Sequence, residues 1–161
     1  MVKHRKNKWR FGVNSVNIVV AGTGYVGLVT GACLSEVGHT VTCVDIDEKK
    51  VEIMKQGISP IYEPGLDELL ERNYKENRLD FTTDYANAYK NADIVFIGVG
   101  TPEREDGSAN LDYVFTVCKE IAESMKTSWK QACVRFLNFW PWYHNNYMKE
   151  KERKQIWVII L

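Results

Sequence analysis

The residues with the clearest chemical meaning in this sequence are three glycines and one aspartate. Gly22, Gly24 and Gly27 have the spacing Gly-x-Gly-x-x-Gly, and Asp45 follows 18 residues after the last of them. Glycines at these positions allow a tight turn, a close approach of a pyrophosphate to the backbone, and close packing of a helix on a strand. The carboxylate is placed to accept hydrogen bonds from ribose hydroxyls. The pattern indicates dinucleotide binding.

The segments around these residues predict the elements that must position them. Residues 16–21 form an apolar strand, and a helix begins after the turn, so that its free N–H groups and positive dipole end face the phosphates. A second apolar strand, 40–45, ends at the aspartate. A plain strand-to-helix turn is the structural alternative. We expect the cofactor-binding residues of this turn to be Gly22, Thr23, Gly24, Tyr25, Val26 and Gly27.

Asp45 also bears on the choice of cofactor. Its negative charge would repel the 2′-phosphate of NADP, so the sequence favours NAD. Capping of a local turn is the alternative role for this carboxylate. We predict NAD as the cofactor and a ribose contact for Asp45.

The remaining pattern alternates strands with helices. Such alternation is typical of a parallel sheet with right-handed crossovers. We predict an α/β fold, a Rossmann-like doubly wound parallel sheet truncated after about its fourth strand. An uncovered fourth strand would be an apolar edge, so we expect poor solubility or a homo-oligomer. Further strands are predicted over 79–82 and 92–99, and helices over 25–37, 48–56, 66–74, 84–90 and 111–125.

Composition divides the 161 residues into three parts. Residues 1–15 carry five basic side chains and no acidic one, residues 16–126 carry 19 acidic and ten basic, and residues 127–161 carry six basic and two acidic. All five tryptophans lie outside 16–126. We predict a basic, disordered extension at 1–15, an incomplete NAD-binding Rossmann domain at 16–126, and an atypical tail of unknown structure at 127–161.

Several classes of protein do not fit this sequence. No apolar run reaches the roughly 18 residues of a membrane span, and no secretory h-region is evident. The four cysteines lack metal-ligand spacing, and no catalytic Ser/His/Asp or Cys/His set can be assembled. We expect no bound metal, no membrane, a cytoplasmic location, and buried free thiols at Cys33, Cys43 and Cys118. The short basic cluster at 3–10 favours a solvated tail over nucleic-acid binding.

Four stretches, in order, carry a family resemblance. They are Gly-Thr-Gly-Tyr-Val-Gly-Leu at 22–28, Val-Asp-Ile-Asp at 44–47, Ser-Pro-Ile-Tyr-Glu-Pro-Gly-Leu at 59–66, and Gly-Val-Gly-Thr-Pro at 98–102 followed by Asp-Gly-Ser at 106–108. On these motifs, residues 16–126 resemble the N-terminal part of UDP-glucose 6-dehydrogenases, in the wider UDP-glucose/GDP-mannose dehydrogenase family. The last two stretches are the more specific.

The resemblance implies an activity for the family and a limit for this chain. The family oxidises C6 of a nucleotide sugar to a carboxylate with two NAD, through a covalent cysteine intermediate. Its catalytic cysteine, lysine and asparagine lie in later domains, and none of the four cysteines here matches the nucleophile. We therefore predict no catalytic residue in this chain, weak NAD binding at most, no turnover, and UDP-glucose as a partner of the full-length enzyme only.

The resemblance also implies further cofactor contacts. Lys50 matches a basic position near the adenosine, with simple solvation as the alternative. Val99, Thr101 and Pro102 end the fourth strand, which the family places against the cofactor; a rigid strand end is the alternative. Glu103 departs from the threonine found there in many relatives, which puts its contact in doubt.

The flanks suggest how the chain arose. Family members usually begin where Val16 stands, and the likeness is expected to stop near 125–127, as an alternative start and a shifted reading frame would produce. Three other functions stay open: GDP-mannose 6-dehydrogenase or another NAD-dependent sugar-nucleotide dehydrogenase, a non-enzymatic nucleotide-binding module, and a methyltransferase-like domain. The glycine spacing argues against the last of these.

Overall fold

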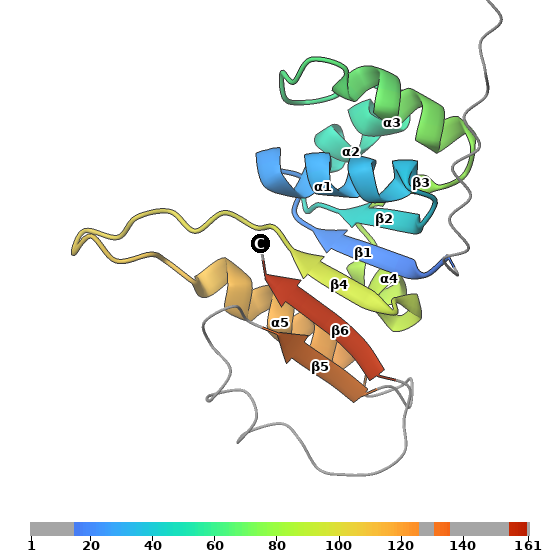
Figure 1. The fold of residues 1–161 in the computed structure, drawn as a ribbon. Helices are drawn as coiled ribbons and strands as arrows, with labels where there is room; N and C mark the ends of the chain where they lie inside the picture. Colours follow the sequence, from blue (N-terminus) through green and yellow to red (C-terminus); the bar gives the residue numbers. More distant parts are fainter. Residues whose placement is uncertain (1–14, 126–130, 136–154, 161) are drawn as a thin grey trace, which may run out of the picture.

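The computed structural model of the chain describes residues 15–125, 131–135 and 155–160. The predicted basic extension lies outside the described residues, apart from Ser15. The described strands form one parallel sheet in the order β3-β2-β1-β4-β6-β5 (Figure 1). The strands are β1 (Asn17–Ala21), β2 (Thr40–Val44), β3 (Leu79–Thr82), β4 (Ile94–Ile97), β5 (Gln131–Arg135) and β6 (Gln155–Ile160).

Five helices cover this sheet on its two faces. The first three pack on one face and the last two on the other, as Figure 1 shows. All five occur where the sequence predicts helices, with ends that differ by at most one residue. They are α1 (Tyr25–Glu36), α2 (Glu48–Lys55), α3 (Leu66–Lys75), α4 (Tyr85–Asn91) and α5 (Asp112–Met125).

Local chemistry explains where the helices begin and end. Asp47 caps α2 by accepting hydrogen bonds from the N–H groups of Lys49 (3.0 Å) and Lys50 (3.3 Å). Asp84 caps α4 through the N–H of Asn87 (3.1 Å). Such caps satisfy N–H groups that have no partner within the helix. Gly38 follows α1 with φ of +107°, which glycine adopts without steric cost.

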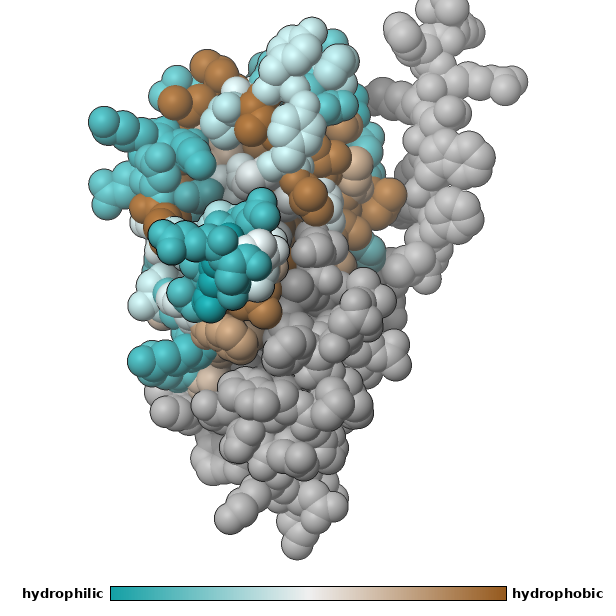
Figure 2. All heavy atoms as spheres, turned by 90° about the vertical axis from the view of Figure 1, so that its left-hand side faces the viewer, coloured by the Kyte–Doolittle hydropathy of each residue, from teal (hydrophilic) through white to brown (hydrophobic). Residues whose placement is uncertain are grey.

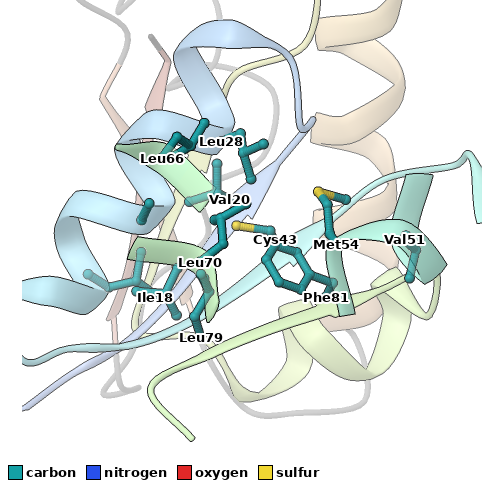
Figure 3. Packing of buried hydrophobic residues seen from close by; sticks show 12 residues of the cluster. Ile18, Val20, Leu28, Cys43, Val51, Met54, Leu66, Leu70, Leu79 and Phe81 are labelled. Carbon is teal, nitrogen blue, oxygen red and sulfur yellow. The ribbon is translucent and has the colours of Figure 1, made fainter. Parts of the chain in front are cut away.

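The core has two layers, one on each face of the sheet. The larger layer lies between the sheet and the helices α1, α2 and α3, and it joins side chains of β1 and β2 to side chains of these helices. Leu28, Met54 and Leu70, one from each helix, are fully buried in it (Figure 3). On the other face, Tyr89 of α4 and Val114, Val117 and Ile121 of α5 pack with side chains of β1, β2 and β4. Cys118 packs beside them and is half-buried.

The cysteine prediction holds in part. Cys43 is buried and Cys118 is half-buried, but Cys33 is exposed on α1, so the expectation of a buried thiol there is wrong. The described cysteines are all free thiols. Cys133 falls on β5, of which only the backbone is described.

The four predicted parallel strands are confirmed, and the sheet continues past them. β6 pairs in parallel with β4, in the register Ile94↔Trp157 to Ile97↔Ile160, and β5 pairs with β6. Truncation after about the fourth strand therefore describes residues 16–126, and β5 and β6 extend the sheet beyond them. The strand β4 is paired on both sides, so it is not the open edge from which we expected self-association. Residues 156–161 are a continuous apolar run with no glycine turn around it, so the sequence does not indicate this pairing.

Candidate functional site

The turn between β1 and α1 is held by contacts that only glycine allows. Gly22 has φ of +96°, and a Cβ there would lie 2.8 Å from the carbonyl oxygen of Gly98. A Cβ on Gly27 would lie 2.0 Å from the carbonyl oxygen of Gly22. Backbone hydrogen bonds from Gly22 to Val44 and from Gly98 to Ala21, both 2.8 Å, join the turn to the ends of β2 and β4. The glycines at 22 and 27 are thus required by packing.

Gly24 differs from its two neighbours in the motif. A Cβ at this position would meet nothing within 4 Å, and the residue is exposed with ordinary backbone angles. It stands at the N-cap of α1, which has no side-chain cap. The N–H of Leu28 bonds to the carbonyl of Gly24 at 2.9 Å and begins the helical ladder, so the N–H groups before it face outward. The helix end is open to an anion.

Asp45 faces this turn. Its Oδ2 accepts a hydrogen bond from the Thr23 N–H at 3.0 Å and another from the Thr23 hydroxyl, and its Oδ1 accepts one from the Asp47 N–H at 3.0 Å. Burial alone would raise the pKa of Asp45, but these hydrogen bonds and the charge of Lys50 outweigh it and lower the pKa. The carboxylate is therefore ionised at neutral pH.

Two further side chains lie near this carboxylate. Lys50, in the first turn of α2, is half-buried, and its charge acts on Asp45. Ile46, the next residue after Asp45, is 90% exposed. Ile46 is not among the site residues predicted from the sequence, although an apolar residue directly after the acid at a strand end is visible there.

The residues that follow β4 lie partly at the glycine turn and partly in the loop that comes next. Val99 is half-buried against the core layer of α4 and α5, and its N–H lies by the turn, 3.0 Å from where a Cβ on Gly22 would stand. Thr101 and Pro102 are exposed, and the carbonyl of Pro102 accepts a hydrogen bond from Asn110 at 2.8 Å. The structure thus brings Val99 to the turn and places Thr101 and Pro102 in a loop that runs outward from it (Figure 1).

Tyr25 joins the turn to a second loop. Its hydroxyl group lies 2.5 Å from the carbonyl of Tyr62 and 2.9 Å from Oε2 of Glu63, and this hydrogen bond to Glu63 raises the pKa of the phenol. Tyr25, Val26 and Tyr62 are all more than half exposed. Figure 2 faces the side toward which the strands of Figure 1 point, and it shows apolar and aromatic atoms exposed between polar ones there.

Other parts of the described chain show fewer features of a binding site than the glycine turn does. A hollow of about 270 Å³ lies against the sheet face near α4, lined by polar side chains such as Thr42, Asp80 and Asn87, away from the glycine turn. Among the described residues, no three His, Cys, Asp or Glu side chains gather as a metal site would require. No described helix has the length and apolar character to cross a bilayer.

A parallel sheet with a glycine turn after β1 and an acid after β2 defines a dinucleotide-binding Rossmann domain, the class found in many oxidoreductases. Within this class, the chain belongs to the UDP-glucose/GDP-mannose dehydrogenase family, because the model of that family's NAD binding domain matches residues 16–134. The match extends past the boundary at residue 126 that the sequence suggested. NAD is the cofactor of this domain.

Similar proteins support the assignment. A UDP-glucose 6-dehydrogenase of Bacillus subtilis (strain 168) is 55% identical over 111 residues, which cover 69% of this chain and 25% of that protein. A GDP-mannose 6-dehydrogenase of Pseudomonas aeruginosa is 43% identical over 111 residues, covering 69% of this chain and 26% of that protein. The chain spans about a quarter of the length of the curated relatives it matches.

Solved structures agree on the fold. A UDP-glucose dehydrogenase from Pyrobaculum islandicum superposes with a TM-score of 0.73 at 33% identity, covering 78% of this chain and 29% of that one. A ternary complex of GDP-mannose dehydrogenase from Pseudomonas aeruginosa gives a TM-score of 0.70 at 42% identity, covering 73% of this chain and 27% of that one.

Proposed function

We propose that the glycine turn and Asp45 bind the pyrophosphate and the adenosine ribose of NAD. The carrying observation is the combination of an open Gly24 with a carboxylate that is fixed against the same turn. A pyrophosphate over Gly24 would meet backbone N–H groups and the positive end of the α1 dipole. The remaining acceptor capacity of Asp45 Oδ1 would take a ribose hydroxyl.

The flanking side chains complete the proposed cofactor site. Ile46, exposed beside Asp45, would pack on the adenine ring, and Lys50 would lie at the adenosine end. Tyr25 and Val26 would line the turn, and Val99 would lie where the strand β4 reaches it. Thr101 and Pro102 would contact the cofactor from the outward loop. NAD, when bound, supplies the acceptor for a hydride.

For a full-length protein that contains this domain, we propose UDP-glucose 6-dehydrogenase activity, conversion of UDP-glucose to UDP-glucuronate with two NAD. The support is the identity to several curated enzymes of that name. GDP-mannose 6-dehydrogenase is the second candidate, supported by the curated relative and the solved complex from Pseudomonas aeruginosa. In a longer protein that contains this domain, NAD-dependent oxidation of UDP-glucose but not of GDP-mannose would separate the two.

We propose that this chain alone performs no turnover. Burial raises the pKa of the Cys43 thiol to about 12 and that of Cys118 to about 11, so neither is a thiolate at neutral pH. We therefore expect no NADH absorbance when the chain is mixed with NAD and either nucleotide sugar. NADH formed in proportion to the chain would contradict this. The three free thiols also support a reducing compartment, such as the cytoplasm.

The ribose contact is tested by titrating the chain with NAD in a calorimeter. Asp45→Asn should weaken binding by about 1.5–3 kcal/mol, because an ionised acceptor is lost. Asp80→Asn is the matched control, since it removes the same charge from an exposed position of β3 and should leave the affinity unchanged. Equal affinity of the Asp45 and Asp80 variants would contradict the assignment of the site.

A further inference from the structure

One residue, Thr23, connects the glycine turn to the carboxylate of Asp45. Thr23 stands between Gly22 and Gly24, is 1% exposed, and directs both its N–H and its hydroxyl to the same oxygen of Asp45. A hydroxyl hydrogen rotates to suit its acceptor. Here the hydroxyl donates to the same carboxylate oxygen as the Thr23 N–H, so the two hydrogen bonds together set the direction of the carboxylate. The turn and the acid therefore move as one unit.

Counting acceptor sites shows what this arrangement leaves open. Each carboxylate oxygen offers about two lone-pair directions. Both directions of Oδ2 are taken by Thr23, while Oδ1 accepts only the Asp47 N–H. Asp45 is thus held through Oδ2, and Oδ1 keeps one free acceptor direction.

We propose that the Thr23 hydroxyl is a positioning group that sets cofactor specificity by fixing the Asp45 carboxylate toward the ribose. This inference rests on the proposed NAD site. A fixed, ionised carboxylate accepts from a 2′-hydroxyl and repels a 2′-phosphate, whereas a carboxylate that can rotate away does neither as well. Thr23 therefore acts through Asp45 and needs no contact with the cofactor through its own hydroxyl.

The discriminating variants are Thr23→Val, which keeps the shape but loses the hydroxyl, and Thr23→Ser, which keeps the hydroxyl. Titration with NAD and with NADP should show Thr23→Val binding NAD roughly tenfold more weakly, with the NAD-to-NADP preference reduced by a similar factor. Thr23→Ser should stay within about threefold of the wild-type values, since its hydroxyl reaches the same oxygen.

The pH dependence of NAD binding supplies a second readout. The Thr23 hydrogen bonds lower the pKa of Asp45, so their partial loss in Thr23→Val should move the acid limb of the binding profile to higher pH. The other groups that act on this carboxylate are Lys50 on α2, the neutral Cys43 thiol on β2 and the Asp47 N–H. All three are unchanged in the variants, so they cannot cause the shift.

The outcomes separate this inference from the proposed function. If Asp45→Asn weakens NAD binding but Thr23→Val keeps the wild-type preference and acid limb, the hydroxyl has only a structural part and the inference is overturned. A wild-type chain that binds neither dinucleotide overturns the proposed site and the inference with it. Should Thr23→Val not fold, as thermal melting would show, Thr23→Ala takes its place with the same expected loss.

Discussion

The polar groups at the two ends of the parallel strands are used in opposite ways. We call the end where the strands begin the amino edge and the end where they finish the carboxyl edge. At the amino edge, the buried Asn73 uses its whole hydrogen-bonding capacity. Its Nδ2 donates to Glu36 and to the Leu69 carbonyl, both at 2.9 Å, and its Oδ1 accepts from Arg78 at 3.0 and 2.7 Å. Arg78 also donates to the carbonyl of Ser35 at 3.1 Å, which ties the end of α1 to the start of β3. We call these residues (Glu36, Asn73 and Arg78, with their carbonyl partners) the amino-edge network.

The carboxyl edge keeps its capacity unused. Gly24 stands before open space, the first N–H groups of α1 face outward, and Asp45 retains an acceptor site. Buried polar groups are stabilising when every partner is present, whereas a binding site needs groups whose partners arrive with the ligand. The comparison predicts that substitutions at the amino edge alter only the stability of the fold. Substitutions at the carboxyl edge should alter NAD binding without loss of stability, except where the backbone is closely packed.

The largest expected effect comes from the crowded part of the turn. Gly27→Ala would place a methyl group 2.0 Å from the carbonyl oxygen of Gly22, so α1 must move off β1. We expect a loss of about 3 kcal/mol or more in the free energy of unfolding, together with loss of NAD binding. Urea denaturation followed by circular dichroism measures it. A variant as stable as wild type would mean that the helix and strand are not packed this closely.

The amino-edge network should give the next largest effect. Asn73→Ala removes a fully buried side chain and the partner that Glu36 and Arg78 share, and we expect a loss of about 1–3 kcal/mol in stability. Asn91→Ala is the control, because Asn91 is exposed at the end of α4. NAD affinity should not change in either variant while the chain is folded. Weaker NAD binding by Asn73→Ala would break the separation between the edges.

Gly24→Ala is the sharpest test of the carboxyl edge, since it is the same substitution as Gly27→Ala three residues earlier. The added methyl group meets nothing within 4 Å in the protein, so stability should stay within about 1 kcal/mol of wild type. The methyl group would stand where the pyrophosphate approaches the backbone, and we expect at least about tenfold weaker NAD binding by calorimetry. Unchanged affinity would place the phosphates elsewhere.

The sequence was enough for the parts of the site that depend on backbone conformation. Glycine spacing and an acid after β2 are local features, so the turn, the helix α1 and the place of Asp45 were all predicted. The motif also predicts Gly22 for the tight turn, Gly24 for access and Gly27 for packing, and the φ of Gly22 and the Cβ contacts agree with that division.

Features that depend on long-range pairing were not predictable in this way. The bond from Thr23 to Asp45 spans 22 residues, and the contact of Tyr25 with Glu63 spans 38. The pairing of β6 with β4 was missed because a continuous apolar run is consistent with a strand but does not indicate which strand lies beside it. The exposure of Cys33 was missed because α1 is apolar nearly all round, which hides which side faces the sheet.

The smallest expected effect is a pH dependence shared by the two edges. At each edge a carboxyl group has a lowered pKa: burial opposes the shift, but Asn73 and Arg72 hydrogen bonds lower the pKa of Glu36, and Thr23 hydrogen bonds lower that of Asp45. A lowered pKa in the folded state gives stability that is complete above the unfolded value, about 4, and is lost as the pH falls through the folded value.

Chemical denaturation at a series of pH values between about 7 and about 3 measures this loss. Glu36→Gln and Asp45→Asn should each make the stability less dependent on pH in the acid range. Saturating NAD should enlarge the acid dependence of the wild type and of Glu36→Gln, because binding lowers the Asp45 pKa further, and should not enlarge it in Asp45→Asn. If NAD enlarges the pH dependence of stability equally in both variants, NAD binding is coupled to a carboxylate other than Asp45. Asp45 would then not distinguish the carboxyl edge from the amino edge.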